Sequence, residues 1–230
     1  MKTVGIIGGM GPETTARFYL DVIFKAYKKN KSQRPSIIIW NVPLKYKIEK
    51  ELIEKAKGEE KYLPYLIKAA KNLEKGGADF IVIPCNTVHI FIEKIRKEVK
   101  IPVLSILEET EKFLKNKNFR KIGLLATELS VKQNLYGKIF ENSGISMVKP
   151  DKFEQKRLGK IINKLATTKY AEKEKARLFK MLWNLDKKDC NAIILACTDL
   201  QLAIKPKEMP MPVYDTMDLL VDATVRELMK

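Results

Sequence analysis

Two stretches of this sequence, LEKGGADFIVIPCNT (Leu73–Thr87) and LDKKDCNAIILACTD (Leu185–Asp199), align without a gap. Each contains the end of a helical pattern, a turn, four apolar residues of strand length, one small residue or proline, and then a cysteine. The constant offset of 112 positions between them indicates that the chain carries two copies of one structural unit.

Two further pairs of segments support this duplication. TVGIIGG (Thr3–Gly9) resembles KIGLLAT (Lys121–Thr127) at an offset of 118 positions. IPVLSILEE (Ile101–Glu109) resembles MPVYDTMDL (Met211–Leu219) at an offset of 110 positions. Three matches in the same order and at nearly the same offset are hard to attribute to chance.

Apolar runs of strand length alternate with amphipathic stretches of helix length. The predicted strands are Thr3–Ile7, Ser36–Trp40, Phe80–Ile83, Val103–Leu104, Lys121–Leu125, Ala192–Leu195 and Val213–Tyr214. The predicted helices are Glu13–Lys28, Tyr62–Lys75, Val88–Lys97, Glu108–Asn116, Lys132–Ser143, Ala171–Leu185 and Asp218–Met229. Continuous apolar strands between helices are typical of parallel sheets that are covered on both faces.

We therefore expect an α/β fold of two similar α/β domains, whose parallel sheets are related by pseudo-twofold symmetry. The last helix is expected to pack back on the first half of the chain. On this pattern the first domain consists of residues 1–103 plus 211–230, and the second of residues 104–210.

The composition is that of a globular protein with a strong basic bias. The 230 residues include 44 Lys+Arg and 28 Asp+Glu, which gives a net charge of +16. A basic surface can attract nucleic acid, an anionic membrane or a small anionic substrate. The lysines, however, are interleaved with glutamates at helical spacing, which favours solvated helix faces, and no helix–turn–helix, zinc-finger or RNA-recognition signature is present. We expect neither nucleic acid nor a membrane as a partner.

The sequence also predicts the compartment and the state of the thiols. No apolar run approaches the roughly 20 residues of a membrane span. The N-terminal MKTVGIIGGM has glycines where a signal peptide would stay apolar, so we expect a cytoplasmic protein. Its three cysteines are then expected to be reactive or buried thiols, and not a disulfide framework.

Cys85 and Cys197 are the candidate catalytic residues. Each lies just past the carboxyl end of a predicted parallel strand, where ligands bind in open α/β sheets. A free cysteine is often only a small buried hydrophobic residue, but two at equivalent strand ends favour a shared chemical role. Cys190 lies before its strand, at the position matched by Ala78, and is interpreted as a structural thiol.

Two opposed thiols suit the inversion of a stereocentre. One thiolate can remove a proton from one face of a carbon while one thiol delivers a proton to the other face, and the two then exchange states. A thiol pKa near 8.5 needs only modest lowering for this work. N–H and hydroxyl donors would stabilise the developing charge on a neighbouring carboxylate.

Three other possibilities for a binding or catalytic site are a phosphate-binding loop, a Cys–His pair and a zinc site. GGMGPET (Gly8–Thr14) lacks the spacing of dinucleotide- and phosphate-binding loops, so a tight turn that approaches a small ligand is the preferred interpretation. His89, the only histidine, could pair with the Cys85 thiol, but a role in local hydrogen bonding is the default. Zinc would require an unusual ligand set, so no metal is expected.

The segments GIIGGMGPETTARFY, GADFIVIPCNTVH, IPVLSILEET, GLLATELSVKQNLY and ACTD together resemble the aspartate/glutamate racemase family, and most closely its pyridoxal-phosphate-independent aspartate racemases. The resemblance spans almost the whole chain. It implies a cofactor-independent amino-acid racemase (an isomerase), an active site between two pseudosymmetric domains, a homodimer, and no pyridoxal phosphate, nucleotide or metal. It makes Cys85 and Cys197 the catalytic pair. It implies carboxylate contacts from Asn86, Thr87 and Thr198, and a site lining that includes Met10, Thr127 and Ser130.

The chain departs from the family pattern in two places. Aspartate-specific relatives carry an arginine shortly after the second strand, whereas residues 43–49 here read PLKYKIE. Either Lys45 or Lys47 takes the place of that arginine, without its bidentate fork, or the substrate is not aspartate. ACTD also replaces the commoner GCTE, which keeps a carboxylate. The sequence therefore predicts racemisation of aspartate or glutamate; a maleate-type isomerase, a hydantoin racemase and a non-catalytic basic binding protein are the alternatives.

Overall fold

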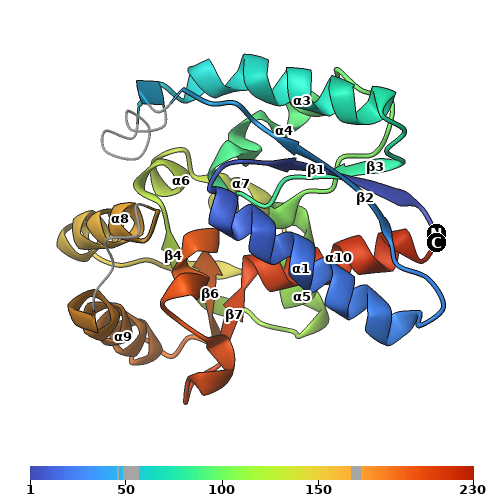
Figure 1. The fold of residues 1–230 in the computed structure, drawn as a ribbon. Helices are drawn as coiled ribbons and strands as arrows, with labels where there is room; N and C mark the ends of the chain where they lie inside the picture. The colour runs from blue at the N-terminus through green and yellow to red at the C-terminus, as the bar shows by residue number, and fades with distance from the viewer. Residues whose placement is uncertain (46, 49–56, 167–171) are drawn as a thin grey trace.

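The structure is a computed structural model that describes residues 1–45, 47–48, 57–166 and 172–230. Its elements form two parallel β-sheets and the helices that cover them (Figure 1). The predicted α/β class with two parallel sheets is confirmed. The termini lie side by side, and the Lys2 N–H donates to the Leu228 carbonyl over 3.2 Å.

The first sheet has the strand order β2-β1-β3, all parallel. Its strands are β1 (Thr3–Gly8), β2 (Ser36–Asn41) and β3 (Phe80–Val82), and its helices are α1 (Pro12–Lys29), η1 (Glu59–Tyr62), α3 (Leu63–Lys75), η2 (Thr87–Phe91) and α4 (Ile92–Arg96). β3 ends one residue before its predicted end, close to Pro84, which lacks the N–H needed to continue the ladder. The predicted strand Val103–Leu104 contributes only an isolated bridge, between Val103 and Ile81.

The second sheet has the order β5-β4-β6-β7, so it repeats the arrangement of the first around its own central strand. Its strands are β4 (Lys121–Ala126), β5 (Ser146–Val148), β6 (Ala192–Ala196) and β7 (Val213–Asp215). The helices of this half are α5 (Ile106–Asn116), α6 (Glu128–Lys132), α7 (Leu135–Phe140), α8 (Lys152–Ala166), α9 (Glu172–Asp186), η3 (Thr198–Leu202), η4 (Pro206–Glu208) and the C-terminal α10 (Thr216–Leu228).

Several elements differ from the sequence prediction. β5 and α8 were not predicted, and the predicted helix Lys132–Ser143 is replaced by α6 and α7, because Asn134 between them has a left-handed φ of 50°. α5 starts two residues early because the Ser105 side chain accepts a hydrogen bond from the Glu108 N–H. Ala171, the predicted start of α9, lies outside the described residues.

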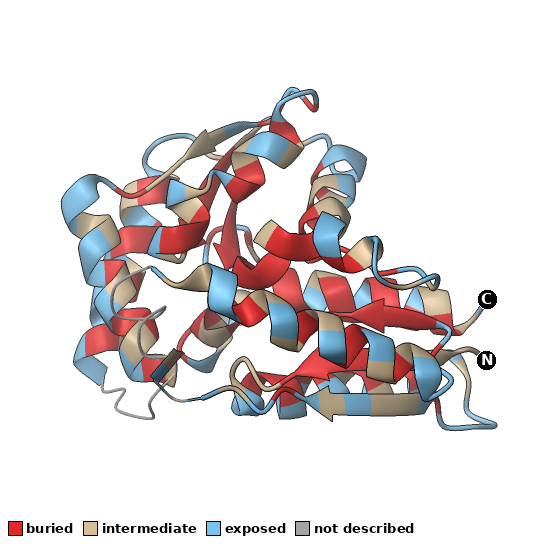
Figure 2. Ribbon diagram, turned by 90° about the horizontal axis from the view of Figure 1, so that it is seen from above, coloured by how far each residue is buried: buried red, intermediate tan, exposed pale blue. Residues whose placement is uncertain are grey.

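The strands are apolar throughout because each sheet is covered on both faces. In β6, Ile194 and Ala196 face a central core, whereas Ile193 and Leu195 face an outer core beneath α8 and α9. The same central core also contains residues of β1, β3, β4, α1, α5, α7 and α10. It lies between the two sheets, and Figure 2 colours its buried residues red (Figures 1 and 2). An equivalent outer core of the first half lies beneath α3 and α4.

The C-terminal helix connects the two halves. α10 packs against α1, as the prediction for the last helix anticipated, and also against α5, while β7 just before it pairs with β6 in the second sheet. The division into domains of residues 1–103 plus 211–230 and residues 104–210 stays a prediction. No helix in the described ranges has the length and apolar character that a membrane span requires.

Candidate active site

A cavity of about 680 Å³ lies at the carboxyl ends of the two sheets and is lined by residues of both halves. Its volume is within the range of small-molecule sites, about 300–1,000 Å³. Seven of the predicted site residues line it: Met10, Cys85, Asn86, Thr87, Thr127, Cys197 and Thr198. Both cysteines thus border one space.

Equivalent backbone positions bring the two cysteines to this cavity. Cys85 is two and four residues from Ile83 and Ile81, so its side chain lies on the same side of the strand as theirs. Cys197 has the same relation to Leu195 and Ile193. Cys85 is half-buried, whereas Cys197 is only 5% exposed. The duplicated strand ends therefore place one thiol from each half beside the same cavity, in different degrees of burial.

Burial and a carboxylate keep the Cys197 thiol protonated. The Cys197 Sγ lies 3.8 Å from Oδ2 of Asp199, which also lines the cavity. Loss of solvation, and then the negative charge of Asp199, raise the pKa of Cys197 well above its usual value. In the absence of a ligand Cys197 is thus a proton donor.

His89 bonds to the main chain at Cys85 and at Ile106. The Ile106 N–H donates to Nε2 over 3.1 Å, so Nε2 carries no proton. The Nδ1–H must then donate to the Cys85 carbonyl, 2.8 Å away. Burial lowers the pKa of His89 to about 4, which keeps the ring neutral in this arrangement.

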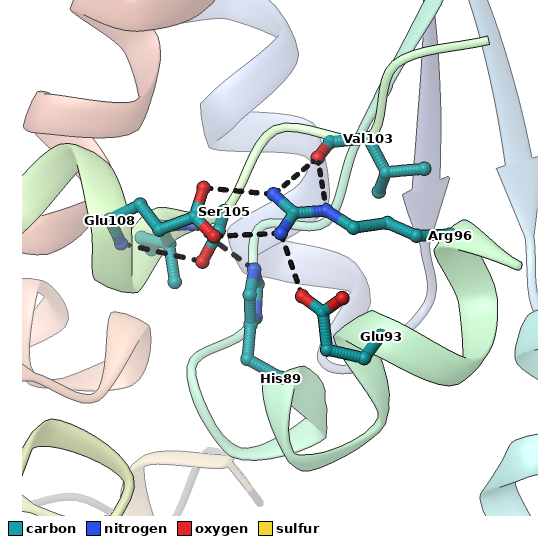
Figure 3. Close-up of polar contacts among 7 residues, drawn as sticks. His89, Glu93, Arg96, Val103, Ser105 and Glu108 are labelled. Atoms are coloured by element: carbon teal, nitrogen blue, oxygen red, sulfur yellow. Dashed lines mark hydrogen bonds and ion pairs between the residues drawn. The ribbon is translucent and has the colours of Figure 1, made fainter. Parts of the chain in front are cut away.

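Arg96 holds the elements around His89 together (Figure 3). Its guanidinium donates to both carboxylate oxygens of Glu108, at 2.7 and 2.8 Å, and to Glu93 at 2.8 Å. It also donates twice to the Val103 carbonyl, at 3.1 and 2.9 Å. This bidentate pairing joins α4 to the start of α5, and so fixes the backbone N–H that His89 accepts.

Hydroxyl groups from both halves meet at the cavity wall. The Thr87 Oγ1 lies 3.0 Å from the Thr127 Oγ1, which in turn lies 2.8 Å from the Ser130 Oγ. Thr127 also accepts a hydrogen bond from the Ser130 N–H. Ser130 does not itself line the cavity, but it orients the two threonine hydroxyls that do.

Asn86 is part of a buried hydrogen-bond chain that links the two strand ends. Its Oδ1 accepts from the Tyr136 hydroxyl over 2.5 Å, and its Nδ2 donates to the Thr216 Oγ1 over 2.9 Å. Thr216 donates to the carbonyl of Leu195, two residues before Cys197. Burial raises the pKa of Tyr136, so the phenol remains a donor. Within the described residues, the second N–H of the Asn86 amide has no hydrogen-bond partner.

The N-terminal glycines shape a turn rather than a phosphate cradle. Gly9 has a φ of +92°, and a Cβ there would lie 2.9 Å from the Val42 nitrogen. A Cβ at Gly8 would lie 2.3 Å from a methyl group of Thr15. This tight turn, which the sequence predicted, leads Met10 and Gly11 to the cavity.

The structure does not bring the predicted lysines to the cavity. Lys45 and Lys47 are exposed, and neither lines it; Tyr46 and Glu49 of the same stretch lie outside the described residues. Among the described residues, the lysines that line it are Lys156, Lys160 and Lys164 of α8. Apolar residues at 158, 161, 162 and 165 had the helical spacing that could have revealed this helix. Glu13 and Glu128 are further lining residues that the sequence analysis did not select.

Two remaining features bear on metals and on the third thiol. Among the described residues, no group of three or more His, Cys, Asp or Glu side chains could hold a metal ion. Cys190 is half-buried and does not line the cavity, and burial raises its pKa.

Comparison with known proteins identifies the family. A family model described as Asp/Glu/Hydantoin racemase matches residues 7–224. This chain belongs to the Asp/Glu/hydantoin racemase family. It is therefore an enzyme of an amino-acid racemase family, as the resemblance implied.

Similar proteins within the racemase family cover nearly the whole chain. The broad specificity amino-acid racemase RacX of Bacillus subtilis is 28% identical over 226 residues, 96% of each chain. A putative Asp/Glu racemase from Yersinia pestis superposes with a TM-score of 0.87 at 26% identity over 100% of both chains. An aspartate racemase from Picrophilus torridus has a TM-score of 0.82 at 25% identity, over 100% of this chain and 95% of the other.

Proposed function

We propose that this racemase interconverts the enantiomers of an acidic amino acid, aspartate or glutamate, without a cofactor, and that Cys85 and Cys197 are its acid and base. The observation that carries the proposal is the shared cavity: two thiols from equivalent strand ends border one small-molecule site. Similarity to an aspartate racemase and to a broad-specificity amino-acid racemase supports the reaction class.

From the different surroundings of the two thiols we propose a starting state for each. Cys197 is buried beside Asp199 and starts as the thiol that donates a proton. Cys85, which is half-buried, starts as the base that removes the Cα proton from the opposite face. After one turnover the two protonation states are exchanged, and the reverse reaction restores them.

The substrate α-carboxylate must be stabilised while Cα loses its proton, because that proton is only weakly acidic. The hydroxyls of Thr87 and Thr127 and the spare N–H of Asn86 are donors at the cavity wall. Thr198, buried directly after Cys197, supplies another hydroxyl. Such oriented donors stabilise the negative charge that develops on the carboxylate oxygens.

Proton exchange at Cα tests this proposal directly. The dialysed protein is incubated with L-aspartate or L-glutamate in D₂O without added cofactor, and chiral chromatography and NMR follow the D-isomer and Cα deuterium. We expect both to appear, and the Cys85→Ala and Cys197→Ala variants each to abolish formation of the D-isomer. Absence of both D-isomer and deuterium with the two acids would refute the substrate assignment.

The same preparation tests the remaining expectations. A substrate panel that includes hydantoins separates an amino-acid racemase from a hydantoin racemase, which the family description also names. We propose a homodimer, which light scattering coupled to size exclusion would detect as twice the 26.5 kDa chain mass. We also propose a cytoplasmic location, which fractionation of the native cells would test.

A further inference from the structure

Helix α8 is fixed above the cavity by contacts on its opposite side. Leu158, Ile161 and Leu165 are buried in the outer core of the second half. The Gln155 Nε2 donates over 3.0 Å to the carbonyl of Ala126, the last residue of β4. These contacts hold the helix in the cavity wall.

The cavity side of α8 carries two lysines one turn apart. Lys156, Gly159, Lys160 and Asn163 all line the cavity, and their spacing of three and four residues puts them on one helix face. Lys164, farther along, bonds to Glu174 over 2.5 Å. In the described part of the chain Lys156 and Lys160 have no carboxylate within ion-pair distance. Two ammonium groups of like charge are thus left beside a cavity, which favours an anionic ligand there.

Gly159 leaves open space beside the two lysines on this helix face. Glycine is a poor helix former, so an interior glycine needs a reason. Packing does not supply one, because the nearest atom to a Cβ at this position would be the Glu128 Oε2, 4.0 Å away. The space that the missing side chain leaves belongs to the cavity wall, which Gly159 lines.

The same cavity is also lined by three carboxylates. Glu13, Glu128 and Asp199 line the same cavity, and Glu128 is the one placed near Gly159. Glu128 would repel a ligand carboxylate at the α8 face, so its removal should strengthen binding there, whereas loss of the lysines should weaken it. Because the two changes should shift ligand binding in opposite directions, comparing them tests whether this face binds the ligand.

We infer that the Lys156–Gly159–Lys160 face of α8 receives the distal carboxylate of a dicarboxylic substrate, and that Gly159 makes room for it. The inference rests on the proposed function and names the residues that set its substrate class. The cation that meets this carboxylate then comes from the second half of the chain and not from the loop after β2, where Lys45 and Lys47 do not line the cavity. The α-carboxylate remains with the hydroxyl cluster.

The test compares L-aspartate with L-asparagine, which has nearly the same shape but no distal charge. We expect the Lys156→Met/Lys160→Met variant to lower the ratio of kcat/KM for aspartate over asparagine about tenfold, and to change the asparagine value less than threefold. The matched control, Lys45→Met/Lys47→Met, should leave the ratio within twofold of wild type. Glu128→Gln should raise the ratio.

A glycine substitution and a binding measurement complete the test. Gly159→Leu should raise the KM for aspartate more than fivefold without lowering Tm, which a purely structural glycine would not do. Calorimetry on the Cys85→Ala/Cys197→Ala variant measures the Kd of L-aspartate without turnover. We expect the added Lys156→Met/Lys160→Met pair to weaken this Kd about tenfold.

The outcomes separate this inference from the proposed function. Racemisation of aspartate with an unchanged ratio in the α8 variant, or a ratio lost in the Lys45/Lys47 control, would overturn the inference and leave the racemase proposal standing. Aspartate binding that depends on Lys156 and Lys160 in a protein that racemises no amino acid would support the inference and refute the proposed function. A wild-type preference for L-lysine over L-aspartate would overturn the assignment of a distal carboxylate to this face.

Discussion

Replacing His89 with glutamine is expected to remove much of the acid sensitivity of this protein between pH 7 and pH 5. The folded chain holds this histidine neutral, with Nε2 accepting from Ile106 and Nδ1–H donating to the Cys85 carbonyl. Protonation would place a second N–H against the Ile106 N–H inside the protein. Acid therefore favours the unfolded state, in which the imidazole is free to bind a proton.

The magnitude follows from the two pKa values. Folding lowers the pKa of His89 from 6.5 to about 4. Its contribution to stability is complete above pH 6.5, falls as the pH drops below 6.5, and stops falling below about pH 4. At 1.36 kcal/mol for each pH unit the whole loss is about 3 kcal/mol, of which about 2 kcal/mol occurs between pH 7 and pH 5.

Urea unfolding at several pH values, followed by tryptophan fluorescence, measures this loss. Wild type should lose about 2 kcal/mol more than His89→Gln between pH 7 and pH 5, since the carboxylates titrate alike in both. The variant should be less stable at pH 7 by about 1–3 kcal/mol, because a buried carbonyl loses its donor. Because the chain has one histidine, ¹⁵N NMR gives a single imidazole titration. A measured pKa above 6, or a neutral ring protonated on Nε2, would refute the reasoning.

Three further predictions concern the cavity and the residues that position its lining. Asp199→Asn removes the charge beside Cys197 and lowers the pKa of that thiol, so its alkylation by iodoacetamide at pH 8, followed by peptide mass spectrometry, should accelerate several-fold; an unchanged rate would mean that burial alone sets the pKa. Tyr136→Phe leaves the buried Asn86 Oδ1 without its donor and should cost about 1–3 kcal/mol in urea unfolding, whereas a cost below about 0.5 kcal/mol would contradict the linking role. Gly9→Ala should destabilise by more than about 1 kcal/mol, because the φ of +92° and the nearby Val42 backbone both oppose a Cβ; a neutral effect on Tm would be inconsistent with the turn described.

The sequence by itself determined the architecture and the two thiols. Internal duplication is visible without coordinates, because both copies preserve the apolar strand, the small residue or proline, and the cysteine that follows. Strand alternation and the rule that ligands bind at carboxyl strand ends then place Cys85 and Cys197 at equivalent positions. These patterns involve residues close together in the chain, so they can be recognised from the sequence without a three-dimensional structure.

The sequence did not predict hydrogen bonds between residues that are far apart in the chain. The role of His89 depends on Ile106, and the linkage of Asn86 depends on Tyr136 and Thr216, 50 and 130 residues away. No spacing rule predicts such contacts, because they form only when α5, α7 and α10 pack between the two sheets.

The lysines proposed to meet the distal carboxylate show most clearly that the sequence does not predict which residues lie together in space. Loop lysines near the second strand were reasonable candidates by position, but a lysine's charge can act at a site only if its helix or loop faces that site. Lys156 and Lys160, which are exposed, line the cavity because α8 packs against η3, α6 and α9 with its polar face toward it. Composition and periodicity specify that a basic amphipathic helix exists, whereas the direction in which it points is a property of the packed tertiary structure.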